Sequence, residues 1–193
     1  MKLSGVFSLI YLILPPLAAA VTPSPPLLPS HHLISAVPYI RQRREHCGPA
    51  TLAMVFGYYN VILPQEELAK EFYRKKISGS LNLDMLISAR KHGFDALTPE
   101  GSRDLLKRYI SSDIPIIVMV SSSPGSKKYH FMIIYGYDDE KELFRIHSGR
   151  TRDGKIGYQE LDRIWAPTGK WMLVVERKKW GVEDQGKAGM SKE

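Results

Sequence analysis

A single cysteine is the residue of this chain best suited to nucleophilic chemistry. Cys47 is the only cysteine among 193 residues, and Gly48-Pro49 follows it directly. Residues 47–59 repeat apolar side chains at helical spacing, and a proline is tolerated in the first turn of a helix. Free N–H groups at a helix N-terminus favour the thiolate. We therefore expect an activated thiol whose partner is a nearby imidazole, although the cysteine count alone also allows an inert buried side chain.

Two motifs resemble those of the bacteriocin-processing, papain-like cysteine peptidases. The first is Gln42 followed by HCGPATLAM at residues 46–54, and the second is HFMIIYGY at residues 130–137. The resemblance covers roughly residues 36–176. It implies a papain-like peptidase that removes leader peptides, often after two glycines, in domains commonly fused to ABC exporters. Ser148-Gly149 and the closing tryptophans are more narrowly similar to a stand-alone, exported branch.

The resemblance also implies roles for individual residues. Cys47 would be the nucleophile, and Gln42 would stabilise the oxyanion together with the Cys47 backbone N–H. His130 would take the proton of the thiol and later pass it to the leaving amine. The expected partner is a peptide or protein substrate, and no cofactor or metal is expected.

The third catalytic member departs from the family pattern. The family usually places an acid on the strand after the histidine, whereas this chain has Ile146-His147-Ser148-Gly149 there. A hairpin that closes symmetrically over residues 139–140 places His130 opposite Gly149, with His147 diagonal to it on the same face. We therefore expect His147 to orient His130. A one-residue bulge would present Ser148 instead, and Asp153 could fold back from the following loop.

Periodicity and turn residues predict the elements that position these groups. Helices are expected at residues 47–59, 64–73, 82–92 and 103–110, after a short extended start at 37–40. Strands are expected at 115–120, 130–137, 142–147, 155–158 and 171–176, with a short helical turn at 159–165. Helices followed by an antiparallel sheet predict an α+β fold.

The N-terminal residues have the features of a secretory signal peptide. A lysine at position 2 precedes an apolar run at 6–14, and three alanines stand at 18–20. We expect cleavage after residue 20, export to the periplasm or outside, and no stable membrane insertion afterwards, an uncleaved anchor being the alternative. Residues 21–36 are interpreted as a proline-rich linker, 37–177 as the peptidase domain and 178–193 as a flexible tail.

Other function classes are weighed against the peptidase. The net charge of +7 is scattered and accompanies no nucleic-acid motif, so nucleic-acid binding is not expected. Capture of an acyl-enzyme by an amine or thiol would make an acyltransferase or transpeptidase. The missing acid favours an inactive, peptide-binding relative. A zinc site of Cys47, His130 and His147 is a further alternative. Nothing in the sequence indicates an oligomeric state.

Overall fold

The computed structural model describes residues 27–123, 125–126 and 128–178. The expected signal peptide, the first six residues of the expected linker and all but the first residue of the expected tail lie outside this range. The helices are α1 (Cys47–Tyr58), α2 (Gln65–Phe72), α3 (Asn82–Lys91), α4 (Arg103–Ser111) and α5 (Tyr158–Trp165). No helix in the described part of the chain is both long and apolar enough to cross a membrane.

The strands follow mainly in the second half of the chain. They are β1 (His31–Leu33), β2 (Tyr73–Arg74), β3 (Gly79–Ser80), β4 (Phe94–Leu97), β5 (Ile116–Ser121), β6 (Tyr129–Asp138), β7 (Leu143–Ser148), β8 (Thr151–Gly157) and β9 (Met172–Arg177). Among the described residues, seven strands form one antiparallel sheet: six lie in the order β4-β9-β5-β6-β7-β8, and the seventh, β1, pairs with β6. Helices packed on an antiparallel sheet confirm the predicted α+β architecture.

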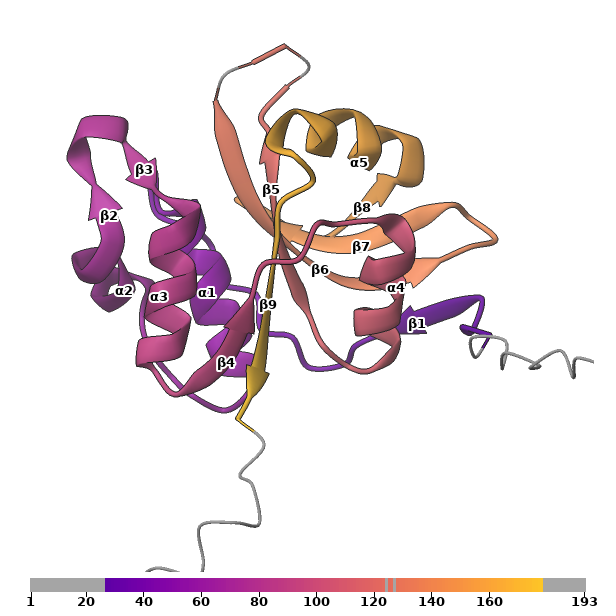
Figure 1. Ribbon diagram of the computed structural model, residues 1–193, viewed down its shortest axis with the longest axis horizontal. Coiled ribbons are helices and arrows are strands. Elements are labelled where there is room, and N and C mark those ends of the chain that lie inside the picture. The colour runs from indigo at the N-terminus through magenta and orange to yellow at the C-terminus, as the bar shows by residue number, and fades with distance from the viewer. Residues whose placement is uncertain (1–26, 124, 127, 179–193) are drawn as a thin grey trace, which may run out of the picture.

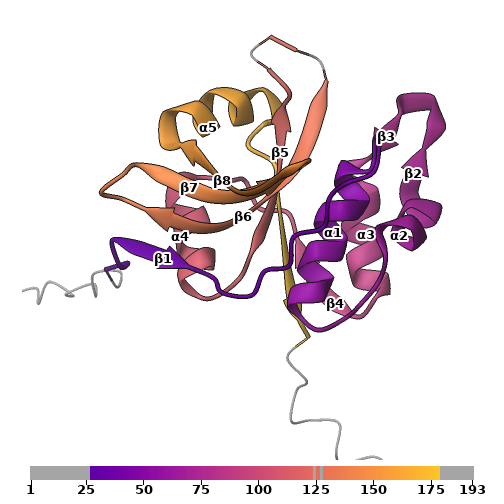
Figure 2. The ribbon, with the colours of Figure 1, turned by 180° about the vertical axis from the view of Figure 1, so that it is seen from behind.

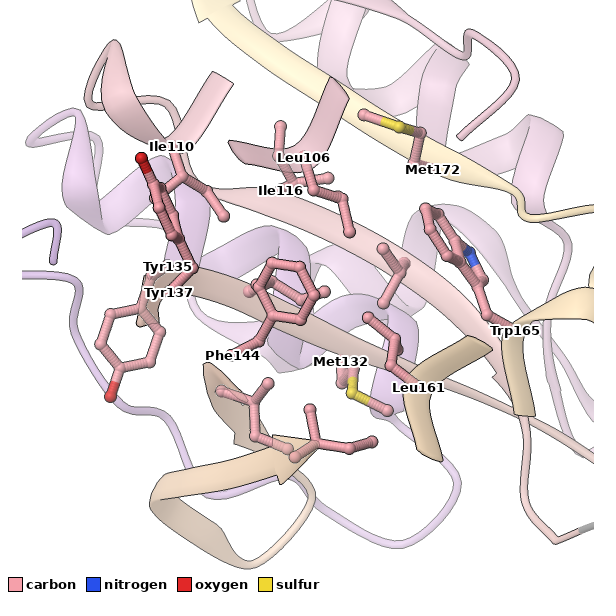
Figure 3. Packing of buried hydrophobic residues seen from close by; sticks show 14 of the residues in the cluster. Leu106, Ile110, Ile116, Met132, Tyr135, Tyr137, Phe144, Leu161, Trp165 and Met172 are labelled. Atoms are coloured by element: carbon pink, nitrogen blue, oxygen red, sulfur yellow. The ribbon is translucent and has the colours of Figure 1, made fainter. Parts of the chain in front are cut away.

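Helices cover the sheet from two sides (Figure 1). Helices α1, α2 and α3 enclose one core with β4, β9 and the Phe131 and Ile133 side of β6. Helices α4 and α5 close a second core on the other face, where Figure 3 shows Leu106 and Trp165 pointing toward the strands. The first core fixes α1, because every residue from Gly48 to Phe56 is buried. Full burial of one large apolar side chain is worth about 1.5–3 kcal/mol, so α1 is firmly held.

The prediction of a proline-rich linker at residues 21–36 is partly wrong. Residues 31–33 form β1, in which His31 pairs with Asp138 of β6. The next residue, Ile34, is only 2% exposed and belongs to the second core. Pairing with β6 therefore overrides the proline-rich composition that favoured a linker. No strand forms at residues 37–40, and this segment instead runs from β1 to α1 (Figure 2).

Two other features were not predicted from the sequence. One is β4, which pairs with β9 at the edge of the sheet. The other is the small hairpin of β2 and β3, which stands beside the N-terminus of α1. Gly48 makes this approach possible, because a methyl group there would lie 3.1 Å from Cβ of Ser80 and 3.2 Å from Sδ of Met85.

Candidate active site

Cys47 is the first residue of α1, as its sequence context predicted. Burial raises the pKa of its thiol, and hydrogen bonds from the backbone at Phe131, Gly48 and Cys47 itself act in the opposite direction. The contact with Phe131 places the sulfur beside the start of β6. Since Phe131 directly follows His130, the helix N-terminus and the histidine strand meet at this point.

His130 is the second residue of β6, and its ring is held from one side by Ser148. His130 Nε2 lies 2.9 Å from Ser148 Oγ. Burial lowers the pKa of the His130 imidazole, so the ring is predominantly neutral at pH 7. When Nε2–H donates to the serine hydroxyl, Nδ1 carries no proton and can accept one.

The predicted register between β6 and β7 is wrong by one residue at the site. The turn takes up residues 139–142, so that Asp138 pairs with Leu143. This pairing differs by two residues from the predicted register. A bulge at Tyr135 reduces the difference to one residue, so that Ile133 pairs with His147. A net shift of one residue moves every side chain to the other face of a strand. Ser148 thereby takes the diagonal position that the predicted register assigned to His147.

His147 consequently lies away from His130 and is only 2% exposed. Its Nδ1 accepts from the backbone N–H of Asp153 at 3.1 Å, and its Nε2 lies 3.3 Å from the carbonyl oxygen of Val37. The Tyr135 ring packs against it with centroids 4.4 Å apart. These contacts leave the imidazole neutral, and burial lowers its pKa. The expected contact between His147 and His130 is therefore replaced by the Ser148 contact.

Asp153, the third candidate orienter, is engaged elsewhere as well. Its carboxylate accepts from the Tyr135 hydroxyl at 2.8 Å. Within the described residues, no carboxylate comes within 4 Å of a nitrogen of His130. The ring is thus oriented by a neutral hydroxyl.

Gln42 reaches the same place from the segment before α1. Its backbone N–H donates to the carbonyl oxygen of Gly149 at 3.3 Å, and the hydroxyl of Tyr39 donates to that oxygen at 3.2 Å. Gly149 has φ +60°, a conformation that favours glycine. A methyl group there would lie 3.6 Å from Gln42 Oε1 and 3.9 Å from His130 Cε1. The side chains of Gln42 and His130 therefore border one small space above Gly149.

Two neighbours of the site were missed by sequence reasoning. Tyr39 anchors the Gly149 turn, but a lone tyrosine in an irregular segment carries no motif. Ser80 lies beside Gly48, and its hydroxyl is buried without a hydrogen-bond partner among the described residues. A serine in a two-residue strand likewise belongs to no recognisable sequence motif.

The arrangement supports nucleophilic thiol chemistry better than metal binding. The described residues contain no group of three or more His, Cys, Asp or Glu side chains that could hold a metal ion. The zinc alternative for Cys47, His130 and His147 therefore finds no such cluster. A half-buried thiol, an imidazole held at Nε2 by Ser148 and a flanking amide remain, and these can carry out acyl transfer.

The fold is shared with solved cysteine peptidases. A double glycine motif protease from an AMS/PCAT transporter, crystallised with a leader peptide, aligns with a TM-score of 0.60 at 24% identity, covering 76% of this chain and 99% of that chain. A C39-like peptidase assigned in Bacillus anthracis gives a TM-score of 0.63 at 16% identity, covering 77% and 98%. The peptidase domain of Streptococcus ComA, a bifunctional ABC transporter, gives 0.62 at 20% identity, covering 72% and 97%. At these identities the likeness establishes the papain-like fold.

The sequence itself places the chain in a family. No curated protein sequence matches it. The sequence model of the Peptidase_C39 like family matches residues 34–172, which contain Gln42, Cys47, His130 and Ser148. That range begins inside the expected linker, at the residue where the buried core begins. The chain therefore belongs to the Peptidase_C39 like family of cysteine peptidases.

Proposed function

We propose that this protein hydrolyses peptide bonds with Cys47 as the nucleophile and His130 as the general base and acid. One observation carries the proposal: the backbone N–H of Phe131, the residue after His130, donates to the sulfur at the N-terminus of α1, and the His130 ring is oriented by Ser148. A nucleophile, a base and a group that orients the base are the parts that activated-nucleophile catalysis requires.

The proposed reaction begins from a neutral pair. Because burial raises the pKa of Cys47 and lowers the pKa of His130, both groups carry no charge in the resting site. The proton then moves from Sγ to Nδ1 as the sulfur attacks the substrate carbonyl carbon. The imidazolium returns this proton to the leaving amine as the C–N bond breaks. Water, deprotonated by His130, cleaves the resulting thioester and restores the thiol.

Gln42 and the Cys47 backbone N–H are the proposed donors to the oxyanion. They would stabilise negative charge that appears on the carbonyl oxygen only in the transition state. The position of Gln42 beside the space above Gly149 supports this role. Ser148 acts as a positioning residue, because its hydroxyl holds the His130 ring at Nε2, which leaves Nδ1 as the nitrogen that would exchange a proton with Cys47.

The proposed substrate is a peptide, and leader peptides are the specific candidate. The solved double glycine motif protease was crystallised with a leader peptide, which supports that choice for a chain of the same fold. We also propose that the protein is exported, with a mature N-terminus near Val21, because residues 1–20 have signal-peptide character. N-terminal sequencing of protein recovered from the cell envelope tests this, and retention of Met1 would contradict cleavage.

Cleavage of a mixed peptide library, followed by mass spectrometry, tests the enzyme proposal. Wild type should generate new termini, and Cys47→Ala should generate none while keeping the wild-type circular dichroism spectrum and melting temperature. Product masses separate hydrolysis from acyl transfer, because capture by an amine adds the mass of that amine. Equal cleavage by Cys47→Ala would overturn the proposal.

The neutral pair and the absent carboxylate also favour a second candidate, a peptide-binding relative that does not cleave. A thiol-selective covalent probe distinguishes the two. An enzyme should be labelled at Cys47 faster than a free thiol of equal pKa, with His130→Ala removing the advantage. Slow labelling that is unaffected by His130→Ala, together with no cleavage, would favour the binding protein.

A further inference from the structure

A cation-rich pocket lies farther along β7, away from Cys47. It has a volume of about 300 Å³ and is bordered by residues of β1, β6, β7 and β8. Its lining includes His31, Leu33, Asp138, Lys141, Arg145 and Lys155. The candidate active site uses none of these residues.

Two positive side chains face each other directly across the strands of this pocket. Arg145 of β7 is the register partner of Lys155 of β8. Directly opposite residues have Cβ atoms about 5 Å apart, and like charges at such positions destabilise a sheet. On the other side of Arg145 the register partner in β6 is Gly136, which has no side chain, and the neighbouring Tyr135 offers Arg145 only a neutral hydroxyl as a hydrogen-bond partner.

Nearby carboxylates do not neutralise this pair. Asp138 is engaged by Lys141, whose Nζ lies 2.5 Å from its carboxylate. The pKa of Asp153 is lowered first by the hydrogen bond from Tyr135, and Arg145 adds only a smaller Coulombic contribution. In the part of the chain that the structure describes, neither Arg145 nor Lys155 has a carboxylate within 4 Å. Among the described residues, the Nε of Arg145 is also buried without a hydrogen-bond partner.

We infer that this pocket binds a carboxylate side chain of the peptide substrate, held between Arg145 and Lys155. An arginine fork and a lysine are the side chains best suited to a carboxylate at a partly exposed site. The occupant, though not the pocket, rests on the proposed peptidase function. Arg145 lies four residues along β7 from Gly149, which is about 13 Å at strand spacing. This length corresponds to about four residues of an extended peptide measured along the strand, and Arg145 shares the face of β7 that carries His147.

Binding to Cys47→Ala protein, which leaves peptides intact, tests the pocket apart from catalysis. The probes are a hexapeptide of alternating Ala and Glu and its Ala–Gln counterpart, each carrying an uncharged fluorophore read by anisotropy. The acidic peptide should bind more tightly than the neutral one. Lys155→Gln, which alters an exposed side chain, and Arg145→Gln should each weaken its binding at least about fivefold. Lys70→Gln, a matched loss of a surface lysine on α2, should leave binding unchanged.

Several outcomes would overturn this inference. The first is equal affinity for the acidic and the neutral peptide. The second is that Lys155→Gln and Arg145→Gln bind the acidic peptide as tightly as the Cys47→Ala protein, and the third is that Lys70→Gln weakens binding as much as they do. Displacement of the acidic peptide by inorganic phosphate more readily than by acetate would assign the pocket to phosphate and refute the carboxylate. If the acidic peptide binds as expected but the wild-type protein cleaves no library peptide, the proposed function is refuted and the pocket assignment stands. In an active protein, replacing the acidic residue of a substrate by Gln should raise KM and leave kcat unchanged.

Discussion

Ser148 offers the sharpest test of how His130 is controlled. Its hydroxyl lies 2.9 Å from His130 Nε2, and Ser148→Ala removes this contact without adding bulk. A partly buried hydrogen bond of this kind contributes about 1 kcal/mol, so its loss should depopulate the productive ring orientation about fivefold. We expect kcat/KM for a library-derived peptide to fall by about that factor, with KM unchanged.

Ser148→Asp extends the test to charge, with Ser148→Asn as its neutral control of similar shape. At about 4 Å two unit charges interact by about 4 kcal/mol at an effective dielectric of 20, and exposure to solvent reduces this to about 1 kcal/mol. A carboxylate should therefore raise the pKa of His130, against the effect of burial. The imidazolium would in turn stabilise the Cys47 thiolate. Iodoacetamide should alkylate Ser148→Asp about five times faster than Ser148→Asn at pH 7.

The pH profile of alkylation shows in which direction the substitution shifts thiolate formation at Cys47. In wild type, burial raises the pKa of Cys47, so alkylation should be slow near pH 7 and should accelerate as the pH rises. In Ser148→Asp the rise should begin at lower pH. Identical profiles for Ser148→Asp and Ser148→Asn, with both proteins folded by thermal melting, would show that His130 does not sense position 148 or does not act on Cys47. Either result would refute the reasoning.

The remaining predictions concern single positions. Gly149→Ala should lose about 1–2 kcal/mol of stability in chemical denaturation, because its φ is +60°, and it should also lower kcat/KM. Gly169→Ala, with φ +64° and open space around it, should lose similar stability but keep kcat/KM unchanged. Burial lowers the pKa of His147, so as the pH drops below about 6.5 the unfolded chain takes up the imidazole proton more readily than the folded protein does, and the free energy of unfolding should fall. His147→Gln should flatten this fall, as measured by urea titrations from pH 7.5 to about 5. Gly101→Ala would drive a methyl group into the Trp165 ring and should lower Tm more than any other substitution here, and an unchanged Tm would contradict this packing.

Much of the fold follows from local pattern. Residues 47–59 repeat apolar side chains at helical spacing, and α1 ends within one residue of the predicted boundary. The apolar run after His130 predicted β6 equally well. By contrast, β1 lacks such a pattern, because its three residues are stabilised by pairing with a strand more than a hundred positions later. Local composition at residues 21–36 contains no trace of that pairing.

The site shows why register is harder to predict than strands. The sequence identified the strands that carry His130, His147 and Ser148, and it named a one-residue bulge as the condition under which Ser148 would replace His147. Whether that bulge forms depends on Tyr135, whose hydroxyl bonds to Asp153 across β7 and β8. It depends as well on the length of the turn that follows Asp138. Both are tertiary properties, so strand periodicity alone could not choose between the two residues.

The pairing of β1 with β6 has a consequence for the order of assembly. A chain made from its N-terminus presents His31–Leu33 long before Gly136–Asp138, their partners, exist. Contacts between residues so distant in sequence close large loops and form slowly. Until β6 appears, β1 has no other described strand to pair with. The N-terminal strand is thus among the earliest segments synthesised and among the last to gain its native neighbours, so a ribosome-stalled chain ending before residue 136 should leave this strand open to proteolysis.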